Sequence, residues 1–426
     1  MPDWNETPVV TVFLHNRGEV LLFRRSEDVG SYPGQWGAVA GHVEGDDPDA
    51  SALDEIEEET RLSERDVSLV RRGEPFPVED EGRETRWIVH PYLFATSTRD
   101  IETNWETAEA EWVAPTVILQ RDVVPKLWTS YRRVAPSPVT IADDTTHGSA
   151  TLSIRALEVL RDRAGMLAAT NHIGAEEARA RIVDAARHLL DARPSMAALR
   201  NRIHRAMHAS RPELSAPTVA VNAHDAIGRA LQADADTAAR AAAIGAERRV
   251  LTLSRSGTVL DALHQAHPAP SVVVAASRPA GEGVGVAEAL AEHGLDVTLI
   301  PDAAVASIIA DDVEAVLVGA DTVLPSGNVV NKTGTRGAAL AALHADVPFY
   351  VACSTDKISP SGTVHTEDGP RRQVYQGAAE LSVRNPTFDV TPAELVTGGF
   401  VTDRDVLSAD DIAAVAEDLA SLADWM

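Results

Sequence analysis

The chain has 426 residues, more than one domain usually holds, so two or three separate cores are expected. Acidic residues outnumber basic ones, 64 against 38, and the net charge of −26 is spread along the whole chain. Such a surface repels phosphate backbones, which argues against direct nucleic-acid binding. It suits a halophilic cytosol, where salt screens the charge, although an ordinary acidic protein can have the same composition.

The chain has one cysteine, Cys353, which excludes an intrachain disulfide and a cysteine-based zinc cluster. No stretch approaches the roughly 18 consecutive apolar residues of a membrane span, and the amino terminus lacks a signal-peptide pattern. We therefore expect a cytoplasmic protein with no membrane partner.

The amino-terminal part predicts a mixed domain. Residues 8–14 and 19–24 predict two strands of a hairpin around His15-Asn16-Arg17-Gly18. Further strands are expected at 67–72, 86–95 and 110–113, with an acidic helix over 48–61 between them. This order predicts an α+β domain over residues 1–128.

The acidic helix carries three carboxylates on one face. Glu55, Glu58 and Glu59 stand at i, i+3 and i+4, so their side chains converge. Carboxylates that close repel one another unless a hard divalent cation neutralises them, which predicts a Mg²⁺ or Mn²⁺ site. The competing interpretation is an acidic helix face exposed to solvent.

This helix and the segment Tyr32-Pro33-Gly34-Gln35-Trp36-Gly37-Ala38-Val39-Ala40-Gly41 before it resemble the Nudix box, and Glu109-Ala110-Glu111-Trp112-Val113 resembles that family's closing strand. The resemblance implies hydrolysis of a nucleoside diphosphate linked to another group. The box departs from the family in four ways: the loop after Gly41 is one residue short, Asp46 replaces a glutamate, Asp54 an arginine and Arg61 a glycine. The family's arginine orients the metal-binding glutamates, whereas Asp54 adds negative charge beside them.

The middle of the chain predicts a linker and then helices. Residues 129–148 are rich in Pro, Ser, Thr and Asp and predict a linker. Residues 149–248 predict an all-helical subdomain, with helices near 151–164, 174–191, 195–209 and 222–243.

Residues 249–426 predict an α/β doubly wound, Rossmann-like parallel sheet. Its expected strands are the apolar, Val-rich runs at 249–254, 271–276, 296–300, 314–318 and 348–353. Ligands of such sheets bind beyond the carboxyl ends of the strands, which here are followed by Ser254-Arg255-Ser256-Gly257, Ser277-Arg278-Pro279, Gly319-Ala320-Asp321 and Cys353-Ser354.

The residues near these strand ends suit a nucleotide or sugar phosphate. Arg278 offers a planar fork for phosphate oxygens, Lys332 a mobile point charge, and Asn331 a donor and acceptor for hydroxyls. Gly257 at a helix start lets backbone N–H groups approach an anion, and Ser254 lies beside it. The alternative for Arg278 and Lys332 is surface charge. Cys353 is expected to be a packed small side chain, with a nucleophile as the alternative.

A second resemblance covers residues 149–425. Arg193-Pro194-Ser195, Ser277-Arg278-Pro279, Val318-Gly319-Ala320-Asp321, Gly327-Asn328-Val329-Val330-Asn331-Lys332-Thr333-Gly334-Thr335 and Pro348-Phe349-Tyr350-Val351 are similar to the family of the regulatory alpha, beta and delta subunits of translation initiation factor 2B, ribose-1,5-bisphosphate isomerase and methylthioribose-1-phosphate isomerase. The resemblance implies an acid/base role for Asp321, for which a structural role is the alternative. It also implies a homo-oligomer.

One departure limits what this resemblance implies about activity. The isomerases carry a cysteine at the position of Ser254 and a histidine at that of Leu253. A serine hydroxyl is a far weaker acid than a thiol, and Leu253 cannot assist it, which argues against isomerisation.

Three functions remain open after this reading. The chain is a Mg²⁺-dependent Nudix hydrolase of an ADP-ribose-like compound fused to a ligand-binding domain, a non-catalytic binding and assembly protein with a degenerate Nudix sensor, or a bifunctional enzyme that also isomerises ribose 1,5-bisphosphate.

Overall fold

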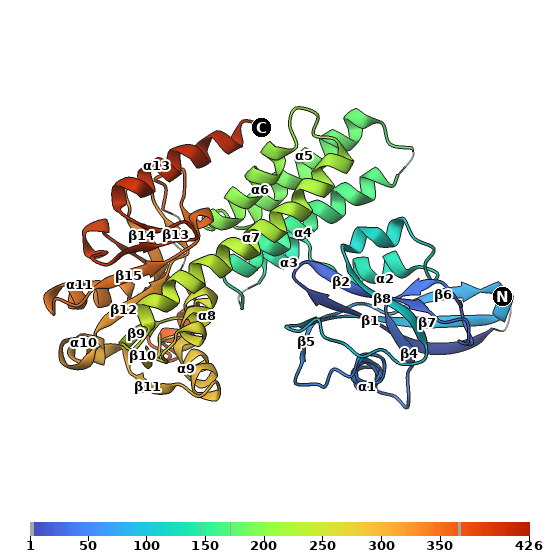
Figure 1. The fold of residues 1–426 in the computed structure, drawn as a ribbon, viewed down its shortest axis with the longest axis horizontal. Helices are drawn as coiled ribbons and strands as arrows, with labels where there is room; N and C mark the ends of the chain where they lie inside the picture. The colour runs from blue at the N-terminus through green and yellow to red at the C-terminus, as the bar shows by residue number, and fades with distance from the viewer. Residues whose placement is uncertain (1–3, 145, 171, 365–367) are drawn as a thin grey trace. The chain divides into compact units, whose positions relative to one another are not determined.

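The computed structural model describes residues 4–144, 146–170, 172–364 and 368–426 (Figure 1). By its internal contacts the chain divides into two compact units. The first comprises Met1–Ser137, Glu158–Ile182 and Ser215–His224, and the second Pro138–Leu157, Val183–Leu214 and Asp225–Met426. No helix in the described ranges is both long and apolar enough to span a membrane.

The first unit is built on a mixed sheet. Its central strand, β1 (Asn5–Asn16), pairs antiparallel with β2 (Glu19–Arg25) and β4 (Val39–His42) and parallel with β7 (Thr85–Thr96). The remaining strands are β3 (Trp36–Gly37), β5 (Val67–Arg72), β6 (Phe76–Asp80) and β8 (Thr107–Val113), with the short helix η1 at Glu81–Arg83. The predicted strands are confirmed, and the short β3, β4 and β6 are additional.

Helix α1 (Pro48–Thr60) forms where the acidic helix was expected. Asp47 caps it by accepting hydrogen bonds from the Asp49 and Ala50 N–H groups, and Pro48 takes the first helical position, which needs no donor. The apolar side chains of Ala52 and Ile56 are fully buried in the core with the sheet. This packing sets which face of α1 presents its glutamates.

The structure differs from the sequence analysis over residues 129–148. Most of this segment lies in two helices, α2 (Leu127–Val134) and α3 (Pro138–Ala142), which follow η2 (Pro115–Leu119). Leu127, Tyr131 and Val134 are at most 2% exposed and pack in the core of the first unit, and Ile141 is fully buried. The segment therefore has the apolar face that its composition conceals.

The predicted helices of the middle region are present as α4 (Ser149–Ala168), α5 (Ala175–Ala192), α6 (Ala197–Ala209) and α7 (Ala216–Gly245). Part of α4 belongs to the first unit. The buried Glu158 bonds His15 through Oε1 and Nε2, 2.9 Å apart, and Tyr131 donates to Asp162 Oδ2 over 2.7 Å. Hence the first compact unit extends beyond the residue 128 boundary drawn from the sequence.

The second unit contains the doubly wound sheet, in the order β11 (Asp296–Ile300), β10 (Ser271–Ala275), β9 (Arg249–Leu253), β12 (Ala315–Gly319), β15 (Phe349–Ala352), β17 (Gly399–Val401) and β18 (Val406–Leu407). Neighbours are parallel as far as β17, and β18 is antiparallel. The predicted parallel sheet is confirmed.

Alternate residues of these strands are buried on opposite faces of the sheet. Leu251 and Val273 share a core with α10 (Val305–Asp312), α11 (Thr335–His344) and α13 (Ala409–Ala420). Val250 and Val272 share another with α7, α8 (Gly257–Gln265) and α9 (Glu282–Glu292). Both faces are thus covered by helices, as the apolar strands require.

A small antiparallel sheet, which the sequence analysis did not predict, joins β13 (Thr322–Val323), β14 (Val329–Lys332) and β16 (Phe388–Thr391). The short helices of this unit are η3 (Asp302–Ala304), η4 (Thr355–Lys357), α12 (Arg371–Val374), η5 (Ala393–Leu395) and η6 (Ser421–Ala423).

Candidate functional sites

A pocket lies beyond the carboxyl ends of β9, β10 and β12, where the strand order reverses. Its volume is about 370 Å³. Four of the predicted residues line it: Ser254, Arg278, Asp321 and Lys332. The structure therefore brings together side chains from three strand ends and from β14.

The turns after β9 and β10 are tied together by backbone hydrogen bonds. Ser254 and Ser277 both adopt left-handed backbone angles, with φ of 63° and 57°. The Ser254 N–H donates to Ser277 Oγ over 2.7 Å, and Asp302 accepts the N–H groups of Ser277 and Arg278 at 2.9 and 2.8 Å. These bonds fix the backbone that carries Arg278.

The two predicted cations of the pocket differ in their surroundings. Within the described part of the chain, no acceptor lies within hydrogen-bonding distance of the exposed Arg278 guanidinium. The Lys332 amino group instead donates to Glu282 Oε1 over 2.6 Å and lies 5.7 Å from the centre of the Phe388 ring. Arg278 is thus open to an anion, whereas an anion at Lys332 meets the negative charge of Glu282.

The segment between α3 and α4 forms one wall of the pocket and was missed from the sequence. Asp144, His147 and Gly148 line the hollow, and the Arg193 Nε donates to Ile141 O over 3.0 Å. Arg193 also bonds the Asp144 carbonyl.

Asp144 is the anchor of this wall. Partial burial opposes its ionisation, but the N–H groups of His147 and Thr146 and their side chains hold the pKa of Asp144 well below its usual range. Arg155 donates to the same carboxylate over 2.8 Å. The only sequence signal for this wall was the motif that contains Arg193.

Two predicted ligand-binding residues do not line the pocket. Asn331 is buried and its amide donates to Thr335 Oγ1 over 3.0 Å, which gives it a structural role here. Gly257 is the first residue of α8, and Ser256 caps the amino terminus of this helix. Cys353 is fully buried in the core, and burial raises its pKa to about 12, so it is a packed small side chain.

In the first unit, two of the three predicted glutamates of α1, Glu55 and Glu59, lie against β4. A Cβ on Gly41 would come within 1.5 Å of Glu55 Oε1, so only glycine admits this carboxylate. Glu59 is 6% exposed and accepts the Ala40 N–H over 3.0 Å, while Glu58 is exposed.

Burial and neighbouring charges raise the pKa of two carboxyl groups of α1. Burial, followed by the charge of Glu58, raises the pKa of Glu55 to about 7. Burial likewise raises the pKa of Glu59 to about 8, against the hydrogen bond from Ala40. Burial and nearby negative charge both favour the protonated form of these acids.

Two departures from the Nudix pattern line one hollow of about 310 Å³ with Glu55 and Glu58. Arg61 ends α1 with a φ of 61°, a left-handed conformation that suits glycine, and its side chain lines the hollow. Asp54 lines it too. The chain therefore has a cation near the glutamates, but two turns further along the helix than Asp54.

Carboxylate oxygens are the donors that Mg²⁺ and Mn²⁺ prefer, so the chemistry of this group fits a divalent cation. Their positions fit less well. Across the described ranges, no group of three or more His, Cys, Asp or Glu side chains is arranged to hold a metal ion. Binding would therefore require a change in the side-chain positions of these glutamates.

Comparison with known proteins identifies both domains. The family described as the initiation factor 2 subunit family matches residues 145–408, over half of the chain. The chain belongs to the initiation factor 2 subunit family. The NUDIX domain family matches residues 5–134, so this family member carries an amino-terminal Nudix domain.

Three similar proteins illustrate the relationship. Ribose 1,5-bisphosphate isomerase of Haloferax volcanii is 32% identical over 296 residues, which are 64% of this chain and 88% of that protein. The crystal structure of translation initiation factor eIF-2B from Pyrococcus horikoshii OT3 matches with a TM-score of 0.54 and 26% identity, over 63% of this chain and 94% of that one. The tetrameric eIF2B-beta2-delta2 complex from C. thermophilum shares the fold alone, with a TM-score of 0.52 and 20% identity over 68% and 95% of the two chains.

Proposed function

We propose that this member of the initiation factor 2 subunit family is a hydrolase of a nucleoside diphosphate derivative, such as ADP-ribose, fused to a domain that binds a nucleotide or sugar phosphate without isomerising it. The observation that carries the proposal is the convergence of Arg278, Lys332 and Asp321 at one hollow beyond the strand ends.

The hydrolase part rests on the glutamates of α1. Glu55, Glu58 and Glu59 would hold a divalent cation, which when bound neutralises phosphoryl oxygens and activates water. Gly41 leaves room for the Glu55 carboxylate, and the Ala40 N–H orients Glu59. The bond from Ala40 holds one of the three acidic groups before any substrate arrives, which reduces the cost of ordering it.

A hydrolysis screen tests this part. The full chain, in high salt with Mg²⁺ or Mn²⁺, should hydrolyse at least one of ADP-ribose, nucleoside triphosphates, NADH or nucleotide sugars. Glu58→Gln should abolish turnover and leave the fold intact, because Glu58 is exposed. The matched control is Glu57→Gln, an exposed neighbour that removes the same charge from the same hollow.

If wild type hydrolyses none of these compounds with either metal, the enzymatic proposal is wrong. The non-catalytic alternative then takes its place, a binding and assembly protein whose Nudix domain senses a ligand.

In the carboxy-terminal pocket, Arg278 would receive a phosphate through paired N–H groups, and Asp321 would accept hydrogen bonds from ribose hydroxyls. Binding needs only these charges and hydrogen bonds. Isomerisation by the family's route needs a thiol, and the chain's single cysteine is buried away from the pocket. We therefore expect binding without turnover, although the Haloferax volcanii relative carries the name of an isomerase.

Calorimetry of the full chain with AMP, ribose 5-phosphate and ribose 1,5-bisphosphate tests the pocket, and Lys332→Ala should remove the heat. Formation of ribulose 1,5-bisphosphate at a rate that survives Cys353→Ser but not Asp321→Asn would make the chain a bifunctional enzyme. We also propose a cytoplasmic homo-oligomer, as the sequence analysis expected. A structural neighbour with two kinds of subunit is itself a tetramer.

A further inference from the structure

Asp321 lies between two residues whose positions are fixed from outside the strand. Before it, the Ala320 carbonyl accepts a hydrogen bond from Lys357 Nζ over 2.8 Å. After it, Thr322 Oγ1 donates to the Ser195 carbonyl over 3.0 Å. The backbone on each side of this pocket aspartate is therefore held by a side chain.

Lysine is an unusual residue at a buried position that fixes a backbone carbonyl. Lys357 is 5% exposed, and burying an ammonium group costs far more than burying an apolar side chain of equal length. The chain has few lysines, at positions 126, 332 and 357. The hydrogen bond from Lys357 to the Ala320 carbonyl, next to the pocket aspartate, explains why a lysine is buried at this position.

The short helix η4, which carries Lys357, is itself fixed at each of its residues. The Thr355 N–H donates to Asp403 Oδ1 over 2.5 Å. Asp356 accepts Arg202 Nε over 3.0 Å and Arg205 over 2.6 Å. Lys357 therefore reaches Ala320 from a segment with little freedom to shift.

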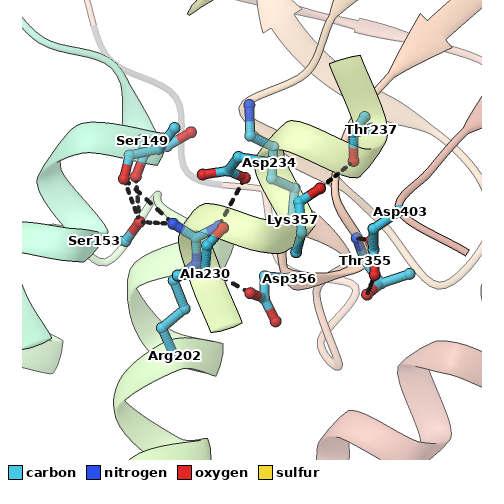
Figure 2. A network of polar contacts seen from close by, with 12 residues as sticks. Ser149, Ser153, Arg202, Ala230, Asp234, Thr237, Thr355, Asp356, Lys357 and Asp403 are labelled. Atoms are coloured by element: carbon cyan, nitrogen blue, oxygen red, sulfur yellow. Dashed lines mark hydrogen bonds and ion pairs between the residues drawn. The ribbon is translucent and has the colours of Figure 1, made fainter. Parts of the chain in front are cut away.

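Arg202 is the centre of this network (Figure 2). Besides Asp356, its guanidinium donates to Ser153 Oγ over 2.9 Å and to Asp234 Oδ1 over 2.8 Å. The carbonyls of Ala150 and Ala230 accept at 3.3 and 3.4 Å. All five N–H donors of the buried guanidinium are thus used, so the network is fully satisfied on the arginine side.

Helix α6 supports both sides of Asp321. Its first residue, Ala197, donates its N–H to Thr322 Oγ1 over 3.4 Å. One turn later, Asn201 donates to the carbonyls of Asp356 and Ile358 at 2.8 and 2.7 Å, next to Arg202. Because a helix is stiff over two turns, the two supports of Asp321 are fixed relative to each other.

We propose that Lys357 and Thr322 are positioning residues for Asp321, and that α6 with η4 braces the floor of the ligand pocket. This inference rests on the proposed binding function of that pocket. Neither residue touches the ligand. Their effect on affinity passes through the placement of the Asp321 carboxylate.

A double-mutant cycle in the full chain tests this role, with AMP and ribose 5-phosphate as probes. Lys357→Met should weaken binding roughly tenfold in the wild-type background and have no further effect in Asp321→Asn, because residues that act through one group are not additive. Equal losses in both backgrounds would overturn the proposal, since a merely structural role gives additive effects.

The matched control is Asp234→Asn, which removes a partner of Arg202 but no support of Ala320 or Thr322. It should lower stability and leave the affinity unchanged. If Lys357→Met does not fold, the isosteric Thr322→Val takes its place in the cycle with the same expectation.

Hydrogen exchange separates failure of this inference from failure of the binding function. The Asp321 N–H donates to Val330 O over 3.0 Å, so its exchange reports the local opening of the pocket floor without ligand. Lys357→Met and Thr322→Val should each speed exchange at residues 320–322, and Asp234→Asn should not. If wild type binds neither probe, this measurement alone decides, and unchanged exchange in both variants overturns the proposal.

Discussion

The Lys332 ammonium lies 2.6 Å from Glu282 Oε1. A carboxylate of α9 is therefore already paired with the cation that would bind a ligand phosphate. The other oxygen of Glu282 is buried and, among the described residues, has no hydrogen-bond partner. The negative charge of Glu282 is therefore balanced by its ion pair with Lys332. A ligand phosphate at Lys332 has to displace this carboxylate or bind against its negative charge.

Removing this competitor should strengthen binding. Glu282→Gln keeps the size of the side chain but releases Lys332, and we expect the affinity for ribose 5-phosphate to rise roughly threefold to tenfold, or about 1 kcal/mol. Calorimetry at fixed ionic strength measures the change. Glu288→Gln, an exposed carboxamide substitution on the same helix, is the control and should have little effect.

A fall in affinity after Glu282→Gln would contradict this prediction. It would mean that Glu282 holds Lys332 in the position that the ligand needs.

Reversing the charge at position 54 tests the weakest part of the Nudix site. Asp54 is one of the charges that raise the pKa of Glu55. Asp54→Arg replaces this repulsion by attraction, so we expect it to favour ionised Glu55 and raise kcat/KM roughly tenfold. The hydrolysis assay of the proposed function measures it.

The control is Glu57→Arg, which makes the same change of charge at an exposed position in the same hollow. An equal gain from both variants would indicate general attraction of an anionic substrate. An unchanged rate in Asp54→Arg would mean that Arg61 already supplies the cation.

Stabilisation by Mg²⁺ should depend on pH. The pKa of Glu59 rises from 4.5 to about 8 on folding, so the folded state holds the proton more tightly. Without metal, stability is then lost as pH rises from about 4.5 to about 8. A cation that binds the ionised carboxylates competes with these protons, so its benefit grows over the same window.

We expect Mg²⁺ to raise the apparent Tm of the Nudix domain by roughly 5 °C at pH 8 and by much less at pH 5. Scanning calorimetry at constant ionic strength measures both values. Glu59→Gln should flatten the pH dependence. An equal Mg²⁺ effect at both pH values would show that the ion binds elsewhere or not at all.

The sequence predicted the long elements of both domains for a clear reason. Residues 272–276 form an unbroken apolar run, and β10 needs such a run because helices cover both of its faces. The small sheet escaped prediction because β13 has two residues and its strands pair across distant segments, as Asn331 does with Asp389. Two residues carry no periodicity.

The helices within residues 129–148 were not predicted, because the composition of this segment concealed their apolar spacing. Its Pro, Ser and Thr content is typical of linkers, yet Leu127, Tyr131 and Val134 have the spacing of one helix face. That pattern begins before the expected boundary at residue 128, so each half looked too short to be a helix.

The candidate pocket was half predictable. Ser254, Arg278 and Asp321 lie within three residues of strand ends, and parallel strands bring their carboxyl ends to one edge. Glu282 and Asp144 reach the same hollow from a helix start and from a loop, and no rule of spacing relates such positions. Nothing in the sequence indicates that the Asn331 amide donates to Thr335 Oγ1, a contact that only the packing reveals.

The last prediction concerns acid sensitivity at the buried His204, whose Nδ1 accepts the Trp425 N–H over 3.0 Å. Burial, followed by the nearby charge of Arg200, lowers the pKa of His204 from 6.5 to about 4. The unfolded chain therefore takes up this proton first, and stability falls as pH drops from about 6.5 to about 4. Protonation would also remove the acceptor for Trp425.

We expect this residue to account for a loss of about 3 kcal/mol in the free energy of unfolding across that window. Urea titrations followed by tryptophan fluorescence at pH 7, 5.5 and 4 measure it. His204→Gln keeps an acceptor for Trp425 but cannot titrate, so its loss should be smaller by that amount, whereas His188→Gln, on the exposed side of α5, should behave like wild type. If His204→Gln and wild type lose stability in parallel, His204 is not the group whose protonation destabilises the protein. The acid sensitivity then lies in another residue.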